Sequence, residues 1–98
     1  MIVVTGAIAV TPETLADLTA ACIAHSQRSR AEPGCVAHNV HADCENPLRL
    51  FFFEQWTDRD ALAAHFRVPE SIELVRTVRR LGAETTGAQI FETVAVKV

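Results

Sequence analysis

The hydrophobic and polar positions at the start of the chain predict a strand followed by a long helix. Residues 2–10 form a short apolar run rich in β-branched side chains, which is typical of a strand. Between Thr11 and about Ala31, apolar residues recur at helical spacing. Thr11 suits the N-cap and Pro12 the first helical position. The segment Glu32-Pro33-Gly34 ends the helix, because proline cannot continue the hydrogen-bond ladder.

The middle of the chain predicts a β-hairpin. Residues 35–41 alternate as a strand does, residues 43–47 form a polar turn, and residues 48–56 form a second, more apolar strand. The second strand is apolar on both faces, with Leu50, Phe52 and Trp56 on one side and Phe51 and Phe53 on the other. One face therefore needs helices to cover it, and the other face needs a second sheet.

Two helical pieces and a final strand complete the predicted order. Thr57-Asp58 caps the first piece, which ends where Pro69 breaks the helix. The apolar face of this piece consists of Ala61, Leu62, His65 and Phe66. The second piece carries an apolar face made of Ile72, Val75, Val78 and Leu81. Residues 88–98 alternate in the manner of a fourth strand.

This order of elements predicts one α+β domain that spans residues 1–98. We expect a ferredoxin-like βαββαβ layout, in which a four-stranded antiparallel sheet carries its helices on one face. The uncovered face would expose Phe51 and Phe53 as an apolar patch in a monomer. A chain of 98 residues also has a thin core by itself. We therefore expect a homodimer that packs sheet to sheet.

Composition and charge narrow the class of protein. Apolar residues make up 49% of the chain and charged residues 21%, which is typical of a folded domain and not of a disordered one. The net charge is −3 and there is no basic run, so we expect no nucleic-acid partner. No apolar stretch approaches the ~20 residues that span a bilayer, so we expect no membrane segment. Three cysteines without a CxxC pair argue against a disulfide framework and favour the cytoplasm.

Three segments carry a resemblance to a known family. They are Ser29-Arg30-Ala31-Glu32-Pro33-Gly34-Cys35, the turn Glu45-Asn46-Pro47, and Phe53-Glu54-Gln55-Trp56-Thr57-Asp58 leading to Ala61-Leu62-Ala63-Ala64-His65. Together they resemble the antibiotic biosynthesis monooxygenase family of dimeric α/β barrels, over essentially the whole chain. In that family each protomer keeps a pocket between its sheet and its helices. Some members oxygenate anthrones, quinols or related polyphenols without metal or flavin.

The resemblance implies a cofactor-independent monooxygenase that oxidises a small aromatic, quinol or anthrone-like compound with dioxygen. Heme-degrading relatives typically carry an asparagine, a tryptophan and a histidine at three positions. An ungapped comparison assigns these positions to Gly6, His65 and Val75. None of the three matches, so we do not expect heme degradation. Two other functions stay open: a non-catalytic module that binds a small ligand, and another small-molecule enzyme such as an isomerase or decarboxylase. The absence of tyrosine removes one common donor to a phenolate.

Glu54 and His65 are the candidate catalytic residues. Glu54 has the same strand parity as Phe52 and Trp56, so its carboxylate should face the helices, where it needs a partner. His65 lies on the apolar face of the following helix, three residues after Leu62. A carboxylate beside an imidazole orients the ring and makes it a better general base. The alternative is that the two side chains only lock the helix to the sheet.

Other side chains are candidates for the substrate pocket. Trp56, Phe52 and Phe66 are expected in the core and as an aromatic wall against a flat substrate. On the strand 35–41, either His38 or the pair Asn39 and His41 faces the pocket, and the unknown pairing register decides which. We favour His38. His25 falls near the edge of the long helix's apolar stripe, where we favour a half-buried helix histidine over a residue that reaches the same cavity.

The sequence carries no metal-site spacing. His38 and His41 are three residues apart on a strand and so point to opposite faces, and no second pair of ligands is spaced as in a zinc site. We therefore expect no metal, and the family resemblance implies no cofactor. Cys22, Cys35 and Cys44 are expected to be buried structural thiols.

Overall fold

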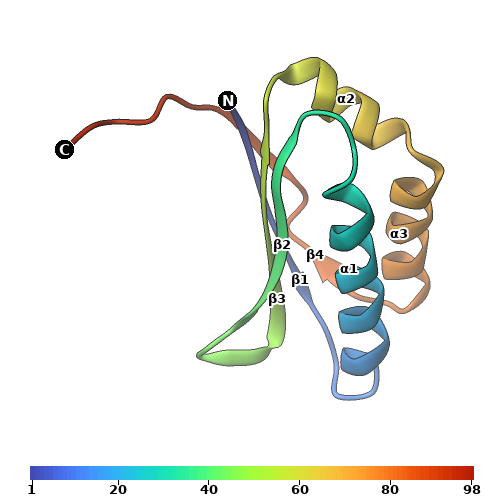
Figure 1. Cartoon of the computed structure of the whole chain (residues 1–98). Helices are drawn as coiled ribbons and strands as arrows, with labels where there is room; N and C mark the ends of the chain where they lie inside the picture. Colours follow the sequence, from blue (N-terminus) through green and yellow to red (C-terminus); the bar gives the residue numbers. More distant parts are fainter.

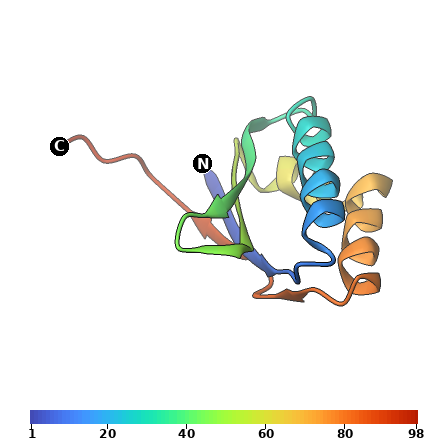
Figure 2. The same cartoon turned by 90° about the horizontal axis from the view of Figure 1, so that it is seen from below.

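A computed structural model describes all residues 1–98, as an antiparallel sheet with three helices on one face (Figures 1 and 2). In chain order the elements are β1 (Ile2–Ala9), α1 (Leu15–Ser29), β2 (Cys35–Asp43), β3 (Asn46–Trp56), α2 (Arg59–Arg67), α3 (Pro69–Arg80), β4 (Glu84–Thr85) and β5 (Gln89–Glu92). The strands lie in the order β2-β3-β1-β4, and β5 also pairs with β1. This is the predicted ferredoxin-like α+β fold. None of its helices has the length and apolar character needed to cross a membrane.

Strand β3 confirms the predicted division of the sheet into two faces. Leu50, Phe52, Glu54 and Trp56 are buried on the side of the helices. Phe51 and Phe53 alternate with them and are half-buried on the other side, which no helix covers (Figure 2). Since successive strand residues point to opposite faces, one side of β3 belongs to the core and the other to an open surface.

The core between the sheet and the helices consists of two apolar clusters. One contains Ile8, Val10, Leu18, Cys22, Leu50, Phe52 and Val78. The other contains Ile2, Val4, Trp56 and Leu62. On β3, Glu54 lies between Phe52 of the first cluster and Trp56 of the second. His25, His38 and His65 are also buried, at 5%, 0% and 3% exposure. Burying polar groups costs free energy unless they are paired, so this polar band between the clusters needs an explanation.

The helix starts follow the predicted signals only in part. Asp58 is the N-cap of α2, and its side chain accepts a hydrogen bond from the Ala61 amide at 2.8 Å, as expected. Helix α1 begins at Leu15, so the predicted start at Pro12 was wrong. The hydroxyls of Thr11 and Thr14 instead bond to each other at 3.0 Å and stabilise a turn before the helix.

Helix α3 faces the core with a stripe that only partly matches the predicted one, since Val78 is buried and Leu81 packs against the core as expected. Ser71 and Val78 are buried, and Leu74 is half-buried between them. Ile72 and Val75 are 44% and 49% exposed, so placing them on the buried face was wrong. Helix α3 packs beside α1 and α2. Apolar spacing alone allowed either stripe, because the two differ by about one residue, or 100° around the helix.

The strand predicted over residues 88–98 is shorter than expected, because only β5 forms there, and the two-residue strand β4, which was not predicted, precedes it. β4 pairs with Ile8 and Ala9, and β5 pairs with residues 2–5, both on the same strand β1. Thr93 donates two further hydrogen bonds to the Met1 carbonyl, from its backbone amide and its hydroxyl, and the remaining residues run away from the sheet (Figure 1). They leave the sheet because β5 has already reached the end of β1, so no neighbouring strand of this chain remains to pair with them.

The three cysteines occupy different environments and none is in a disulfide. Cys22 is buried in the core, and burial raises the pKa of its thiol to about 11. Cys35 is half-buried. Cys44 is exposed in the turn between β2 and β3, so the expectation of a buried thiol was wrong there. A tight turn projects beyond the sheet, and nothing packs over it.

Candidate active site

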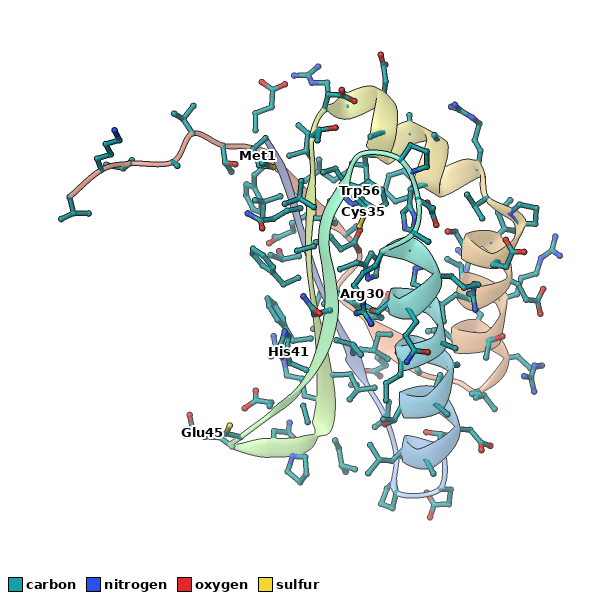
Figure 3. The ribbon with its side chains drawn as sticks, viewed as in Figure 1. Met1, Arg30, Cys35, His41, Glu45 and Trp56 are labelled. Atoms are coloured by element: carbon teal, nitrogen blue, oxygen red, sulfur yellow. The ribbon has the colours of Figure 1, made fainter.

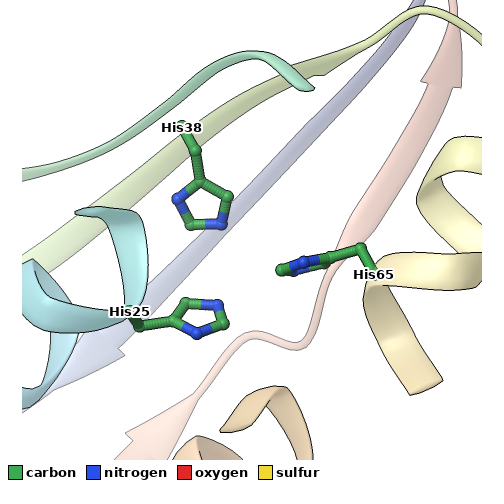
Figure 4. A group of neighbouring side chains, drawn as sticks. All are labelled: His25, His38 and His65. Atoms are coloured by element: carbon green, nitrogen blue, oxygen red, sulfur yellow. The ribbon is translucent and has the colours of Figure 1, made fainter. Parts of the chain in front are cut away.

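Three histidines from separate elements meet between the sheet and the helices. His25 comes from α1, His38 from β2 and His65 from α2, and Figure 4 shows their rings pointing toward one another. The ring centroids are 5.0 Å apart for His25 and His38, 5.2 Å for His25 and His65, and 5.4 Å for His38 and His65. The predicted site residues His38 and His65 are thus neighbours, joined by a third imidazole.

The register of the hairpin decides which residues of β2 join the site. His38 pairs with Glu54 and therefore faces the helices. Asn39 and His41 pair with the phenylalanines of the open face, and Figure 3 shows His41 on the side of the sheet away from the helices. The sequence left His38 and the Asn39–His41 pair as alternatives, and the structure places His38 inside.

Glu54 is held by its neighbours on the sheet. Its Oε1 atom accepts a hydrogen bond from Trp56 Nε1 at 3.0 Å. Its Oε2 atom lies 3.4 Å from Nε2 of His38. Burial raises the pKa of the Glu54 carboxyl, against the smaller opposing effects of the Trp56 hydrogen bond and the nearby His65. The carboxyl group therefore holds a proton to higher pH than a solvated one.

The predicted pairing of Glu54 with His65 is loose, and another carboxylate is closer. His65 Nε2 is 4.0 Å from Glu54 Oε1, whereas His65 Nδ1 is 2.9 Å from Oε1 of Glu32. Glu32 follows the end of α1, where the sequence pattern predicted a helix stop and no role in the site. Glu32 also lies in one of the three segments that carry the family resemblance, and this was the one sequence feature that could have marked it as a site residue.

His25 and His38 are neutral imidazoles at neutral pH. Burial, reinforced by His65 and Arg28, lowers the pKa of His25 to about 4. Burial also lowers the pKa of His38 to about 3, with His25 and His65 as the next largest causes. His38 Nδ1 shares a 2.9 Å hydrogen bond with Ser26 Oγ, and its Nε2 atom is buried without a hydrogen-bond partner.

A cavity of about 390 Å³ opens beside this group, between the sheet and helices α2 and α3. Its walls include His25, Phe52, Glu54, His65, Phe66 and Val78. Phe52 and Phe66 both line this cavity, but Phe66 is 45% exposed, so its expected place in the core was wrong. Trp56 and His38 do not line it. Trp56 lies behind His65, with ring centroids 4.6 Å apart, and so supports the imidazole.

Comparison with known proteins agrees with this architecture. A model of the antibiotic biosynthesis monooxygenase family matches residues 1–77. The chain belongs to the antibiotic biosynthesis monooxygenase family. An uncharacterised protein from Synechocystis is 33% identical over 91 residues, which is 93% of this chain and 62% of that longer protein. The chain therefore spans less than two thirds of this relative.

Solved structures of the antibiotic biosynthesis monooxygenase family share the fold. A Deinococcus radiodurans protein, described as an antibiotic biosynthesis monooxygenase, matches with a TM-score of 0.95 and 21% identity. The match covers 100% of this chain and 98% of that one. SnoaB from Streptomyces nogalater, a cofactor-independent oxygenase solved as its N63A variant, matches with a TM-score of 0.82 and 16% identity, over 97% and 94% of the two chains. These likenesses establish the fold, and family membership supports a monooxygenase-type function.

The structure brings most of the predicted site residues together, and adds two supporting residues that the sequence did not predict. Glu54, His65, His38, Phe52 and Phe66 all face the space between sheet and helices. Sequence reasoning missed Glu32 and Ser26, which hold the outer nitrogens of two histidines. Neither residue lies near its partner in the chain, so no local pattern pointed to them.

Proposed function

We propose that the chain is a cofactor-independent monooxygenase that oxidises a small aromatic, quinol or anthrone-like compound with dioxygen. The observation that supports it most is the setting of His65. Its Nδ1 atom is held by Glu32 at 2.9 Å, while the ring lines the apolar cavity. If Nδ1 donates its proton to the Glu32 carboxylate, Nε2 keeps a lone pair beside the substrate. A general base needs this arrangement.

In the proposed reaction, His65 Nε2 takes the acidic proton of the bound substrate. The resulting anion is electron-rich enough to pass an electron to dioxygen, after which a carbon–oxygen bond forms. For an anthrone, the oxygen–oxygen bond then breaks, and the CH₂ group and O₂ become C=O and one molecule of water. No other oxidant or reductant is required.

The rest of the cavity favours such an anion. Phe52 and Phe66 offer aromatic walls to a flat ring, and a water-poor site strengthens electrostatic interactions with the developing charge. Glu54, whose pKa is raised by burial, can donate a hydrogen bond from its neutral form to a substrate oxygen. We assign Glu54 that role as the second acid–base group. His38 supports it from behind, 3.4 Å away.

The test is oxygen uptake by EDTA-treated protein with dihydroxynaphthalene and anthrone. The His65→Gln and His65→Ala variants should lose activity by about 10²–10⁴-fold. His41→Ala is the matched control, with its mass checked against the parent by light scattering, because His41 lies away from the cavity, on the open face of the same sheet. Uptake that survives the loss of His65 would contradict its role as the base. If no compound is oxidised but several raise the melting temperature, the chain is a ligand-binding module.

The open face of the sheet supports a second proposal, that the functional unit is a homodimer packed sheet to sheet. Helices cover only one face (Figure 2), and Phe51 and Phe53 are half-buried on the other. A second copy of this chain would bury those rings and complete the dimeric barrel that the family resemblance implied.

We also propose a cytoplasmic location, since three unpaired thiols fit a reducing compartment.

A further inference from the structure

The proposed oxygenase chemistry uses one of the three buried histidines directly and leaves the gathering of all three unexplained. One ring nitrogen from each of His25, His38 and His65 lies within 4.8 Å of the others. Neutral imidazole is the form that binds transition metals.

The outer nitrogens of two rings are already held as in metal sites. Glu32 bonds Nδ1 of His65 at 2.9 Å, and Ser26 bonds Nδ1 of His38 at 2.9 Å. Metal-binding histidines commonly have their second nitrogen fixed by a carboxylate or another oxygen, which orients the ring and sets its tautomer. Both bonds leave Nε2 of these rings turned toward the centre.

The inner nitrogen of His38 is an independent sign of a missing ligand. His38 is completely buried, and its Nε2 atom has no hydrogen-bond partner. Buried polar atoms without a partner are rare, because no hydrogen bond within the protein replaces the one lost to water. A bound cation would satisfy this atom. An ion can reach it through the cavity, which His25, His65 and Glu54 line.

Glu54 is placed to supply a fourth ligand. Its Oε2 atom is 3.4 Å from Nε2 of His38, and its Oε1 atom is 4.0 Å from Nε2 of His65. In a tetrahedral site with metal–nitrogen bonds of about 2.0–2.1 Å, ligand atoms lie about 3.3 Å apart. Small rotations of the side chains, which move the nitrogens by about 1.5 Å, are enough to reach this spacing.

We propose that His25, His38 and His65, together with Glu54, bind one divalent first-row transition-metal ion. Three imidazoles and one carboxylate suit ions such as Zn²⁺, Co²⁺ or Fe²⁺, and they do not suit Mg²⁺ or Ca²⁺, which prefer oxygen ligands. This site goes beyond the proposed function and does not depend on it. Bound metal would occupy the lone pair that His65 needs as a base. Zn²⁺, which has no redox chemistry, should therefore inhibit oxygen uptake.

The experiment titrates EDTA-treated protein, transferred to chelator-free buffer, with Co²⁺ and Zn²⁺. Cys44→Ser is used as the parent, because an exposed thiol would bind these ions as well. We expect one equivalent to bind, with visible d–d bands of four-coordinate Co²⁺ and a Zn²⁺ heat signal in calorimetry. His25→Ala and His38→Ala should weaken binding by at least about tenfold. His41→Ala should bind as the parent does.

The outcomes separate this proposal from the oxygenase. The metal titrations contain no substrate and the oxygen assays contain EDTA, so each can fail alone. No saturable binding with a Kd below about 100 µM would overturn the metal site, as would parent-like binding by both histidine variants. If a variant does not fold, ¹⁵N spectra of the parent provide the answer: Zn²⁺ should shift the ring nitrogens of His25, His38 and His65 and leave those of His41 in place.

Discussion

Glu32 holds His65 across 33 positions of the chain, through a 2.9 Å contact between Oε1 and Nδ1. The His65 side chain is 3% exposed and the Glu32 side chain 18%, so the contact lies in a largely dry environment. A carboxylate there fixes both the tautomer and the orientation of the ring. Glu32 touches neither the cavity nor a substrate within it, so it is a positioning residue.

Replacing Glu32 by glutamine should lower kcat of oxygen uptake by about 10²–10⁴-fold while KM changes little. The amide removes the charge that supports the imidazolium formed during proton transfer. Glu32→Asp should restore part of the rate, and Glu45→Gln, in the exposed turn, should have no effect. The check is the pH profile of kcat for each variant. A Glu32→Gln enzyme with the parent's kcat and profile would show that Glu32 only stabilises the fold.

The metal-free protein should lose stability as the pH falls from 7 to 5. Unfolded histidines bind protons near their ordinary pKa of 6.5, whereas burial lowers the pKa to about 4 for His25 and about 3 for His38. The unfolded state therefore binds more protons below pH 6.5, and each histidine should remove up to about 1.4 kcal/mol per pH unit. Glu54 has the opposite effect on the free energy of unfolding. Its pKa is raised in the folded state, so its protonation stabilises the fold as the pH falls and offsets part of this loss.

Urea unfolding at pH 8, 7, 6 and 5, with EDTA present, measures this loss. His25→Gln should make the pH dependence shallower by removing one of the two groups. The His41→Gln control, on the open face of the sheet, should keep the parent's slope. A free energy of unfolding that stays level between pH 7 and 5 would mean that the buried histidines accept protons without cost.

Gly34 is a position where a side chain should be strongly destabilising. Its φ is +80°, and a Cβ atom there would lie 2.5 Å from Cβ of Ala61 and 2.8 Å from Oγ1 of Thr57. Gly34→Ala should cost about 1–2 kcal/mol for the backbone conformation and about 1–3 kcal/mol more for the crowding against α2. Gly82 has φ +71° with nothing near its Cβ position, so Gly82→Ala isolates the backbone part. Thermal melts should rank Gly34→Ala well below Gly82→Ala, and equal melting temperatures would contradict the clash.

The open face of the sheet should hold two copies together. Light scattering at micromolar concentration should give twice the 10.7 kDa mass of the chain. Phe51→Glu or Phe53→Glu places a charge in the interface and should shift the mass toward the monomer. Ile72→Glu is the control, because Ile72 is 44% exposed on the helical side. A monomeric parent at this concentration would remove the case for the dimer.

The sequence by itself determined the features that depend on local spacing. Alternation along β3 placed Glu54 on the same side as Phe52 and Trp56, because strand geometry assigns faces by parity. The turn before β3, the cap at Asp58 and the break at Pro69 were also readable, since each rests on the backbone chemistry of one or two residues. These elements in this order were enough to predict the ferredoxin-like fold.

Only the tertiary structure decided which polar groups meet. The choice of His38 over Asn39 and His41 came from the register between β2 and β3, and a shift of one residue would have reversed it. The contact of Glu32 with His65, and the meeting of His25 with both other rings, depend on how two helices rotate over the sheet. The rotation of each helix is set by the packing of side chains across the whole core. The spacing of residues along one helix does not determine it.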